Sequence, residues 1–173
     1  AAGLQKGDRI CWIGKNSDLY FTLFYGAARA GIVMAPIGWR LSPTEWAFIV
    51  NDTRAKIVFT GAGFDAAAEQ LAGKLDHAPR IIPDAEARAI IAGTSRVDFE
   101  RADKDDPVLQ LYTSGTTGNP KGAVMSNRNL FALRKHSNEA DMPYTRWDDD
   151  EAVLVAMPCA HIGGTGLGIM ALG

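Results

Sequence analysis

The sequence predicts an α/β fold, a doubly wound and mostly parallel sheet flanked by helices. Two observations predict it. Short apolar runs typical of buried strands alternate along the chain with stretches whose apolar residues recur at helical spacing. Helix-capping residues and glycines bound several of these stretches, as expected where crossover helices join parallel strands. The chain has 173 residues, which is enough to bury the core of one domain, and it shows no internal repeat.

Strand and helix signals alternate most clearly in the first sixty residues. Ser17 offers an N-cap to the first helix, and Gly31 ends it. Ser42-Pro43-Thr44-Glu45 forms a capping box with proline at the first helical position, and that helix stops at Asn51-Asp52-Thr53. Three buried strands are expected around these helices, at residues 9–13, 32–37 and 55–60.

The middle of the chain is less regular. Residues 80–82 predict a short fourth strand ahead of an alanine-rich stretch, 84–92. Residues 93–106 are polar and charged, which is typical of a solvated connector. A third helix is predicted by apolar residues at helical spacing, namely Phe64, Ala67, Ala68, Leu71 and Leu75.

The stretch at 109–125, LQLYTSGTTGNPKGAVM, is the most informative in the chain. A strand-like apolar run breaks into ten residues rich in Gly, Ser and Thr, and a second apolar run follows. Backbone amides freed by glycine and small hydroxyl groups are donors suited to anions. Lys121 is the only charged residue between Pro107 and Asn127. The sequence therefore predicts a phosphate-binding loop formed by Thr113, Ser114, Gly115, Thr116, Thr117, Gly118, Lys121 and Gly122.

Two other interpretations of this loop are less favoured. A Walker-type loop has Gly directly before its Lys, Ser or Thr directly after it, and a helix at once. Here Pro120 precedes Lys121, Gly122 follows, and the next helix signal is at Ser126 or Asn127. A flexible Ser/Thr/Gly linker is the other alternative, but linkers seldom lie between two apolar runs.

The loop sequence YTSGTTGNPKG closely resembles the signature loop of the adenylate-forming superfamily, which includes acyl-CoA synthetases, luciferases and the adenylation domains of peptide synthetases. Behind the loop, residues 157–164 resemble the Pro-x-x-His-x-x-Gly element of these enzymes. Ala160 stands where many members carry a bulky residue before the histidine, which here is His161. Three stretches ahead of the loop resemble the same superfamily in order and spacing, at 6–10, 31–36 and 39–45.

The resemblance is greatest to the N-terminal domain of an acyl-CoA synthetase, or fatty-acid–CoA ligase. It implies ATP-dependent activation of a carboxylic acid, foremost a fatty acid, to an acyl-adenylate and then to acyl-CoA. ATP, Mg²⁺ and coenzyme A would take part. Residues 113–122 would grip the β- and γ-phosphates, with Lys121 and His161 as the expected catalytic residues. The alternatives are an adenylation domain that loads a carrier protein or, for this chain alone, an inactive structural core.

Residues 1–173 are expected to form a single partial domain. The family's residues for Mg²⁺ and for the ribose, and its small C-terminal domain, are not found in the sequence. No metal ligand can therefore be named, and the chain alone is expected to be inactive. Apolar surface that such a piece leaves uncovered favours self-association, so a homo-oligomer is expected.

Composition bears on the remaining partners. Eighteen Lys and Arg against 20 Asp and Glu give a net charge of −2 without a basic stripe, so nucleic acid is not expected to bind. Residues 152–173 carry no charge, yet Pro158, His161 and five glycines indicate a buried strand at 153–155, a turn and a helix rather than a membrane span. Cys11 and Cys159 fit no metal-site spacing and predict free buried thiols in the cytoplasm.

Overall fold

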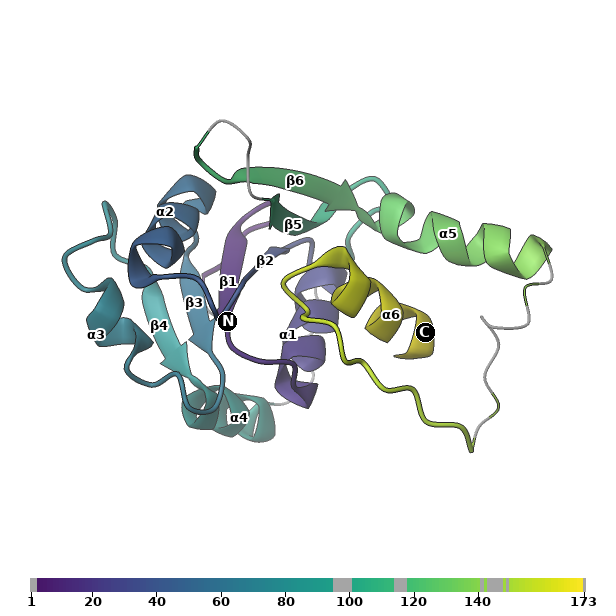
Figure 1. Cartoon of the computed structure of the whole chain (residues 1–173), viewed down its shortest axis with the longest axis horizontal. Coiled ribbons are helices and arrows are strands. Elements are labelled where there is room, and N and C mark those ends of the chain that lie inside the picture. Colours follow the sequence, from purple (N-terminus) through teal and green to yellow (C-terminus); the bar gives the residue numbers. More distant parts are fainter. Residues whose placement is uncertain are drawn as a thin grey trace.

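The structure, a computed structural model, describes residues 3–94, 101–113, 118–140, 142, 148 and 150–172. Its centre is a six-stranded sheet (Figure 1). The strands are β1 (Arg9–Ile13), β2 (Val33–Ile37), β3 (Ile57–Thr60), β4 (Arg80–Pro83), β5 (Pro107–Thr113) and β6 (Lys121–Ser126). They lie in the order β4-β3-β1-β2-β5-β6. All neighbours are parallel except β5 and β6, which form an antiparallel hairpin.

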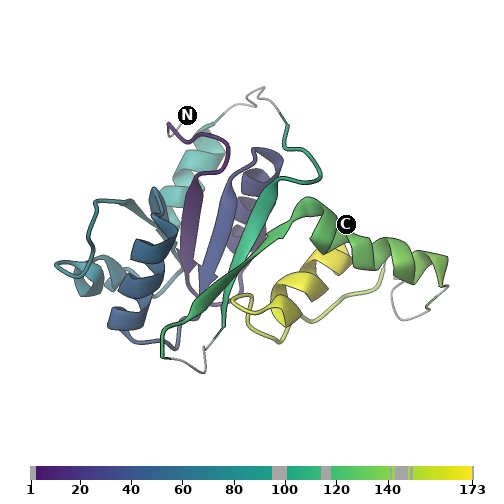
Figure 2. The same cartoon turned by 90° about the horizontal axis from the view of Figure 1, so that it is seen from above.

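Helices cover both faces of the sheet (Figures 1 and 2). They are α1 (Asp18–Arg29), α2 (Pro43–Thr53), α3 (Ala67–Leu71), α4 (Asp84–Gly93), α5 (Asn127–Glu139) and α6 (Ile162–Leu172). Side chains of β1 alternate between two cores, because successive residues of a strand point to opposite faces. Ile10 and Trp12 pack with α1, α4 and α6, whereas Cys11 and Ile13 pack with α2 and α3. The predicted doubly wound sheet is confirmed.

The predicted caps are confirmed as well. The Ser17 side chain accepts a hydrogen bond from the Tyr20 amide at 3.1 Å. Both bonds of the capping box are present at the start of α2, where Ser42 and Glu45 each accept from the other's backbone amide. The third helix is shorter than expected: α3 has five residues, and Phe64 and Leu75 lie outside it. Gly63 and Gly73, both at positive φ, turn the chain on either side of it.

The prediction of a strand at 153–155 is wrong. Residues 151–156 join none of the described strands, and the Leu154 side chain is 83% exposed. A strand needs a neighbour for its backbone hydrogen bonds. Here the Val155 and Met157 carbonyls accept from the Asn16 side chain instead. The helix expected beyond this segment is present as α6. Within the described residues, no helix is long and apolar enough to cross a membrane.

Candidate phosphate-binding site

The β5–β6 hairpin places the predicted loop at the carboxyl edge of the parallel strands. Met34 of β2 pairs with Leu109 of β5 in parallel, so both strands point the same way. Beyond that pair, Thr113 ends β5 and lies opposite Lys121, the first residue of β6. Both side chains are exposed. Open α/β sheets bind ligands at this edge, so the hydroxyl and the ammonium are available to an anion there.

The structure describes four of the eight predicted loop residues. Thr113, Gly118, Lys121 and Gly122 are described, whereas 114–117 lie outside the described residues. Gly118 has φ +107°, a conformation that side-chain-bearing residues rarely adopt. No described carboxylate forms an ion pair with Lys121. The described part of the loop therefore offers an ammonium, a hydroxyl and a glycine turn at one place.

Gly122 also has a packing role that its motif does not suggest. It lies in the extended strand β6 opposite Tyr112. A Cβ at this position would lie 2.5 Å from Nε2 of Gln110 and 3.0 Å from Cζ of Tyr112. The glycine thus makes room for the two side chains of β5 beneath it.

Those two side chains belong to a polar network that the sequence motifs do not predict. Gln110 Nε2 donates to the Tyr112 hydroxyl at 2.9 Å, and that hydroxyl donates to the Asp52 carboxylate at the end of α2. Arg9 Nε donates to Gln110 Oε1 at 3.3 Å. Burial, and then the Asp52 carboxylate, raise the pKa of Tyr112, so the phenol keeps its proton. The one signal of this network in the sequence is Gln110, a polar residue within an otherwise apolar strand.

His161 comes from a different part of the chain, the turn before α6. Its side chain is exposed. Its amide donates to the Pro158 carbonyl at 3.0 Å, and its carbonyl accepts from the amides of Gly164 and Thr165. Among the described residues, no hydrogen bond or ion pair joins His161 to the hairpin.

The two cysteines are buried and free, as expected. Burial raises the pKa of Cys11 to about 12 and that of Cys159 to about 11, so both thiols keep their protons at neutral pH. Neither is a candidate nucleophile. Within the described ranges, no group of three or more His, Cys, Asp or Glu could hold a metal ion.

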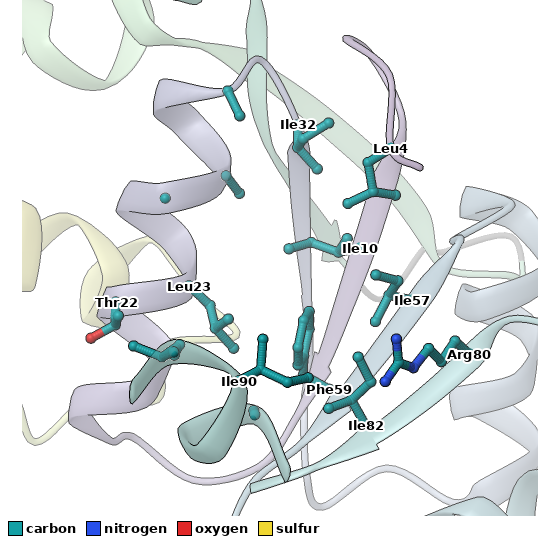
Figure 3. A pocket seen from close by; sticks show the side chains of 15 residues that line it. Leu4, Ile10, Thr22, Leu23, Ile32, Ile57, Phe59, Arg80, Ile82 and Ile90 are labelled. Carbon is teal, nitrogen blue, oxygen red and sulfur yellow. The ribbon is translucent and has the colours of Figure 1, made fainter. Parts of the chain in front are cut away.

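A cavity of about 560 Å³ lies elsewhere, between α1, α4 and the sheet (Figure 3). Ile32, Ile57 and Arg80, at or next to the amino ends of their strands, line it, and no described residue of the hairpin does. Apolar side chains such as Phe59 and Ile90 dominate its wall. The Arg80 guanidinium is already paired with Glu86 at 2.6 Å. This cavity is therefore not the predicted phosphate site.

Comparison with known proteins finds relatives along almost the whole chain. The chain is 35% identical, over 95% of its length, to a fatty acid–acyl-carrier-protein ligase of Streptomyces coeruleorubidus. It is 30% identical, over 94%, to the long-chain-fatty-acid–CoA ligase FadD13 of Mycobacterium tuberculosis. In each case it covers 32% of the relative, so it spans about a third of the length of the curated relatives it matches.

The fold has close counterparts among solved structures. The inhibitor-bound N-terminal domain of FACL13 from Mycobacterium tuberculosis superposes with a TM-score of 0.77 at 28% identity, over 98% of this chain and 42% of that one. Residues 1–172 match the model of a protein family described as AMP-binding enzyme. The chain therefore belongs to the AMP-binding enzyme family.

Proposed function

We propose that the protein activates a carboxylic acid with ATP to give an acyl-adenylate, and then passes the acyl group to a thiol. The observation that carries the proposal is the Thr113–Lys121 pair at the carboxyl edge of the sheet. The hydroxyl and the ammonium there are donors suited to the β- and γ-phosphates of ATP. Family membership supplies the reaction class.

The chemistry requires charge neutralisation. The carboxylate and ATP are both anions, and attack on the α-phosphate expels pyrophosphate, which carries negative charge away. Lys121 stabilises this leaving group, and residues 113–122 are proposed to grip the β- and γ-phosphates. Mg²⁺ would accompany the phosphates, but the described residues supply no ligand set, so no step is assigned to it.

We propose a fatty acid as the substrate and coenzyme A as the acceptor. The M. tuberculosis relative is a ligase of long-chain fatty acids and coenzyme A. The alternative acceptor is a carrier protein, and one specific observation favours it. The S. coeruleorubidus relative, at 35% identity, is a fatty acid ligase for acyl-carrier protein. His161 is proposed to lie beside the acid, with Ala160 leaving space next to it.

ATP–pyrophosphate exchange tests this function. Fatty, aromatic and amino acids would be supplied in turn to the 173-residue chain and to a longer form that spans the length of its relatives. We expect exchange from the longer form with fatty acids and none from the 173-residue chain. Thioester formation with coenzyme A or with acyl-carrier protein then identifies the acceptor. A longer form that exchanges with none of the acids contradicts the proposal.

We also propose that the 173-residue chain self-associates. Large apolar side chains are exposed in several of its elements, namely Ile90, Ile91, Val124, Phe131, Leu154, Met157, Ile162 and Leu172. Apolar side chains left exposed promote association where they gather in a patch. Light scattering is expected to give a dimer or larger, and a monomer at high concentration contradicts this. The two free thiols favour a location in the cytoplasm, where thiols stay reduced.

A further inference from the structure

Asn16 connects the start of α1 to the turn that carries His161. It lies between β1 and the helix cap Ser17. Its Nδ2 donates to the Val155 carbonyl at 2.9 Å and to the Met157 carbonyl at 2.8 Å. Its Oδ1 accepts from the Cys159 amide at 2.9 Å. One side chain therefore uses both its donors and its acceptor on a segment about 140 residues away.

Tyr20 of α1 also reaches this turn, through Thr165 of α6. Thr165 Oγ1 donates to the Cys159 carbonyl at 2.6 Å. Because its proton is used there, the Tyr20 hydroxyl, 2.6 Å from Thr165 Oγ1, must be the donor between them. Tyr20 and Thr165 are both fully buried. Cys159 is thus held at its amide by Asn16 and at its carbonyl by Thr165.

Close packing leaves the turn no room to move toward α6. A Cβ on Gly164 would lie 2.3 Å from the Met157 carbonyl oxygen, and one on Gly168 would lie 2.2 Å from the ring of Phe21 in α1. His161 lies in the chain between Met157 and Gly164, with its amide bonded to Pro158 and its carbonyl to the first turn of α6. The backbone of His161 is therefore fixed from both sides.

We infer that Asn16 is a positioning residue for His161, which it holds at the sheet edge through the 155–159 segment. This inference rests on the proposed function, which gives His161 its place beside the acid. The 151–156 segment has no strand partner among the described residues, and the Asn16 amide holds its Val155 carbonyl and the Met157 carbonyl that follows it. Without it, two carbonyls and one amide lose their partner.

The histidine signals in an NMR spectrum test the inference, because the chain has three histidines, at 77, 136 and 161. Asn16→Ala is expected to shift or broaden the imidazole signals of His161 and to leave those of His77 and His136 in place. Unchanged His161 signals overturn the inference. Because this readout needs no activity, its failure is distinct from failure of the proposed function.

Asn51 supplies a matched control. Its amide also joins a distant backbone, donating to the Lys74 carbonyl at 3.1 Å and accepting from the Asp76 amide at 3.0 Å. Asp76 contacts His77. Asn51→Ala should therefore move the His77 signals and leave His161 unchanged. If Asn51→Ala moves His161 as strongly as Asn16→Ala does, the effect is general loosening and the inference fails.

Hydrogen exchange in two Asn16 variants separates the two bonds that its Nδ2 donates from the bond that its Oδ1 accepts. Asn16→Ala should speed exchange of the Cys159 amide roughly tenfold, the effect of one lost hydrogen bond. Asn16→Asp keeps the acceptor oxygen, so the Cys159 amide should stay protected. The His161 signals should still shift, because the carboxylate has no donor for the Val155 and Met157 carbonyls. If Asn16→Ala unfolds the chain, Tyr20→Phe, which removes one hydroxyl, takes its place with the same expectation for His161.

The longer form, if active in exchange, adds a kinetic readout. Asn16→Ala should raise the KM for the carboxylic acid several-fold and leave the KM for ATP unchanged, since the phosphate hairpin lies on β5 and β6. Asn51→Ala should change neither. Equal increases in both KM values contradict a role specific to His161.

Discussion

Gly122 of β6 passes over the side chain of Gln110 so closely that a Cβ on the glycine would lie 2.5 Å from the amide nitrogen. The amide cannot withdraw without cost, because it donates to the Tyr112 hydroxyl at 2.9 Å and accepts from Arg9. Packing inside the hairpin therefore also requires glycine at position 122, a residue that the sequence motif associates with phosphate.

Gly122→Ala is expected to destabilise the chain by about 1–3 kcal/mol, because overpacking forces neighbouring groups to shift. Urea unfolding measures this. Gly26→Ala is the matched control: Gly26 lies in α1, and apart from its chain neighbours and the nearby backbone of its own helix, no atom lies within 4 Å of the position that a Cβ would take there. Alanine there should be neutral or stabilising by up to about 1 kcal/mol, because it favours helix over glycine. Equal losses in both variants would argue against the packing role.

Lys121→Ala in an active longer form is expected to slow adenylate formation on the order of 100-fold, the effect of losing one donor to a developing anion. Thioester formation started from purified acyl-adenylate should change much less, because pyrophosphate has already left. Single-turnover kinetics of the two steps give the comparison. Lys74→Ala removes one positive charge away from the hairpin and should affect neither step. Equal slowing of both steps by Lys121→Ala would contradict the assignment.

Asp18 provides a pH-dependent link between α1 and α4. Arg88 donates two hydrogen bonds to its carboxylate, at 2.7 and 2.8 Å, and this holds the pKa of Asp18 at about 2. A depressed pKa contributes stability that is present above the unfolded value of about 3.9 and lost as the pH falls toward the folded value.

Asp18→Asn should therefore lower the urea midpoint at pH 5–8 and lose this effect between about pH 4 and pH 2. The pair is exposed, so the difference should be small and should shrink in high salt. Asp65→Asn is the control, since Asp65 forms no ion pair with any described residue. A difference that persists unchanged at pH 2 would rule out the ionic link.

The two thiols are expected to resist modification in the folded chain. Burial raises the pKa of both, so little thiolate is present at pH 8. Ellman's reagent should titrate neither within minutes under native conditions, and both in denaturant. Asn16→Ala should speed the reaction of Cys159, whose amide Asn16 holds, and leave Cys11 slow. Rapid native reaction of Cys11 would contradict the buried core around β1.

Local signals in the sequence predicted most of the fold. Ser17 and the Ser42–Glu45 box act within a single helical turn, so their residue types alone locate the starts of α1 and α2. The hairpin signal around Lys121 was equally local, and the strand ends on both sides of it were predicted within two residues. The family element around the loop then gave the candidate chemistry.

What the sequence could not predict depends on distant contacts. The Val-Leu-Val run at 153–155 looks like a strand, but whether a strand forms depends on a free neighbour in the sheet, which a local pattern does not report. The role of Gly122 depends on Gln110 across the hairpin. The role of Asn16 depends on backbone groups about 140 residues later, and nothing around position 16 indicates them.

The contacts of Asn16 and Tyr20 also set a limit on when the chain can finish folding. Strand β1 and helix α1 are among the first elements to be synthesised, yet the partners of these two side chains lie at residues 155–165. Synthesis at 5–20 residues per second separates the two groups by roughly 7 to 30 seconds. Throughout that interval the Tyr20 hydroxyl and the Asn16 amide depend on water, and Tyr20 gains its buried partner Thr165 only when α6 arrives.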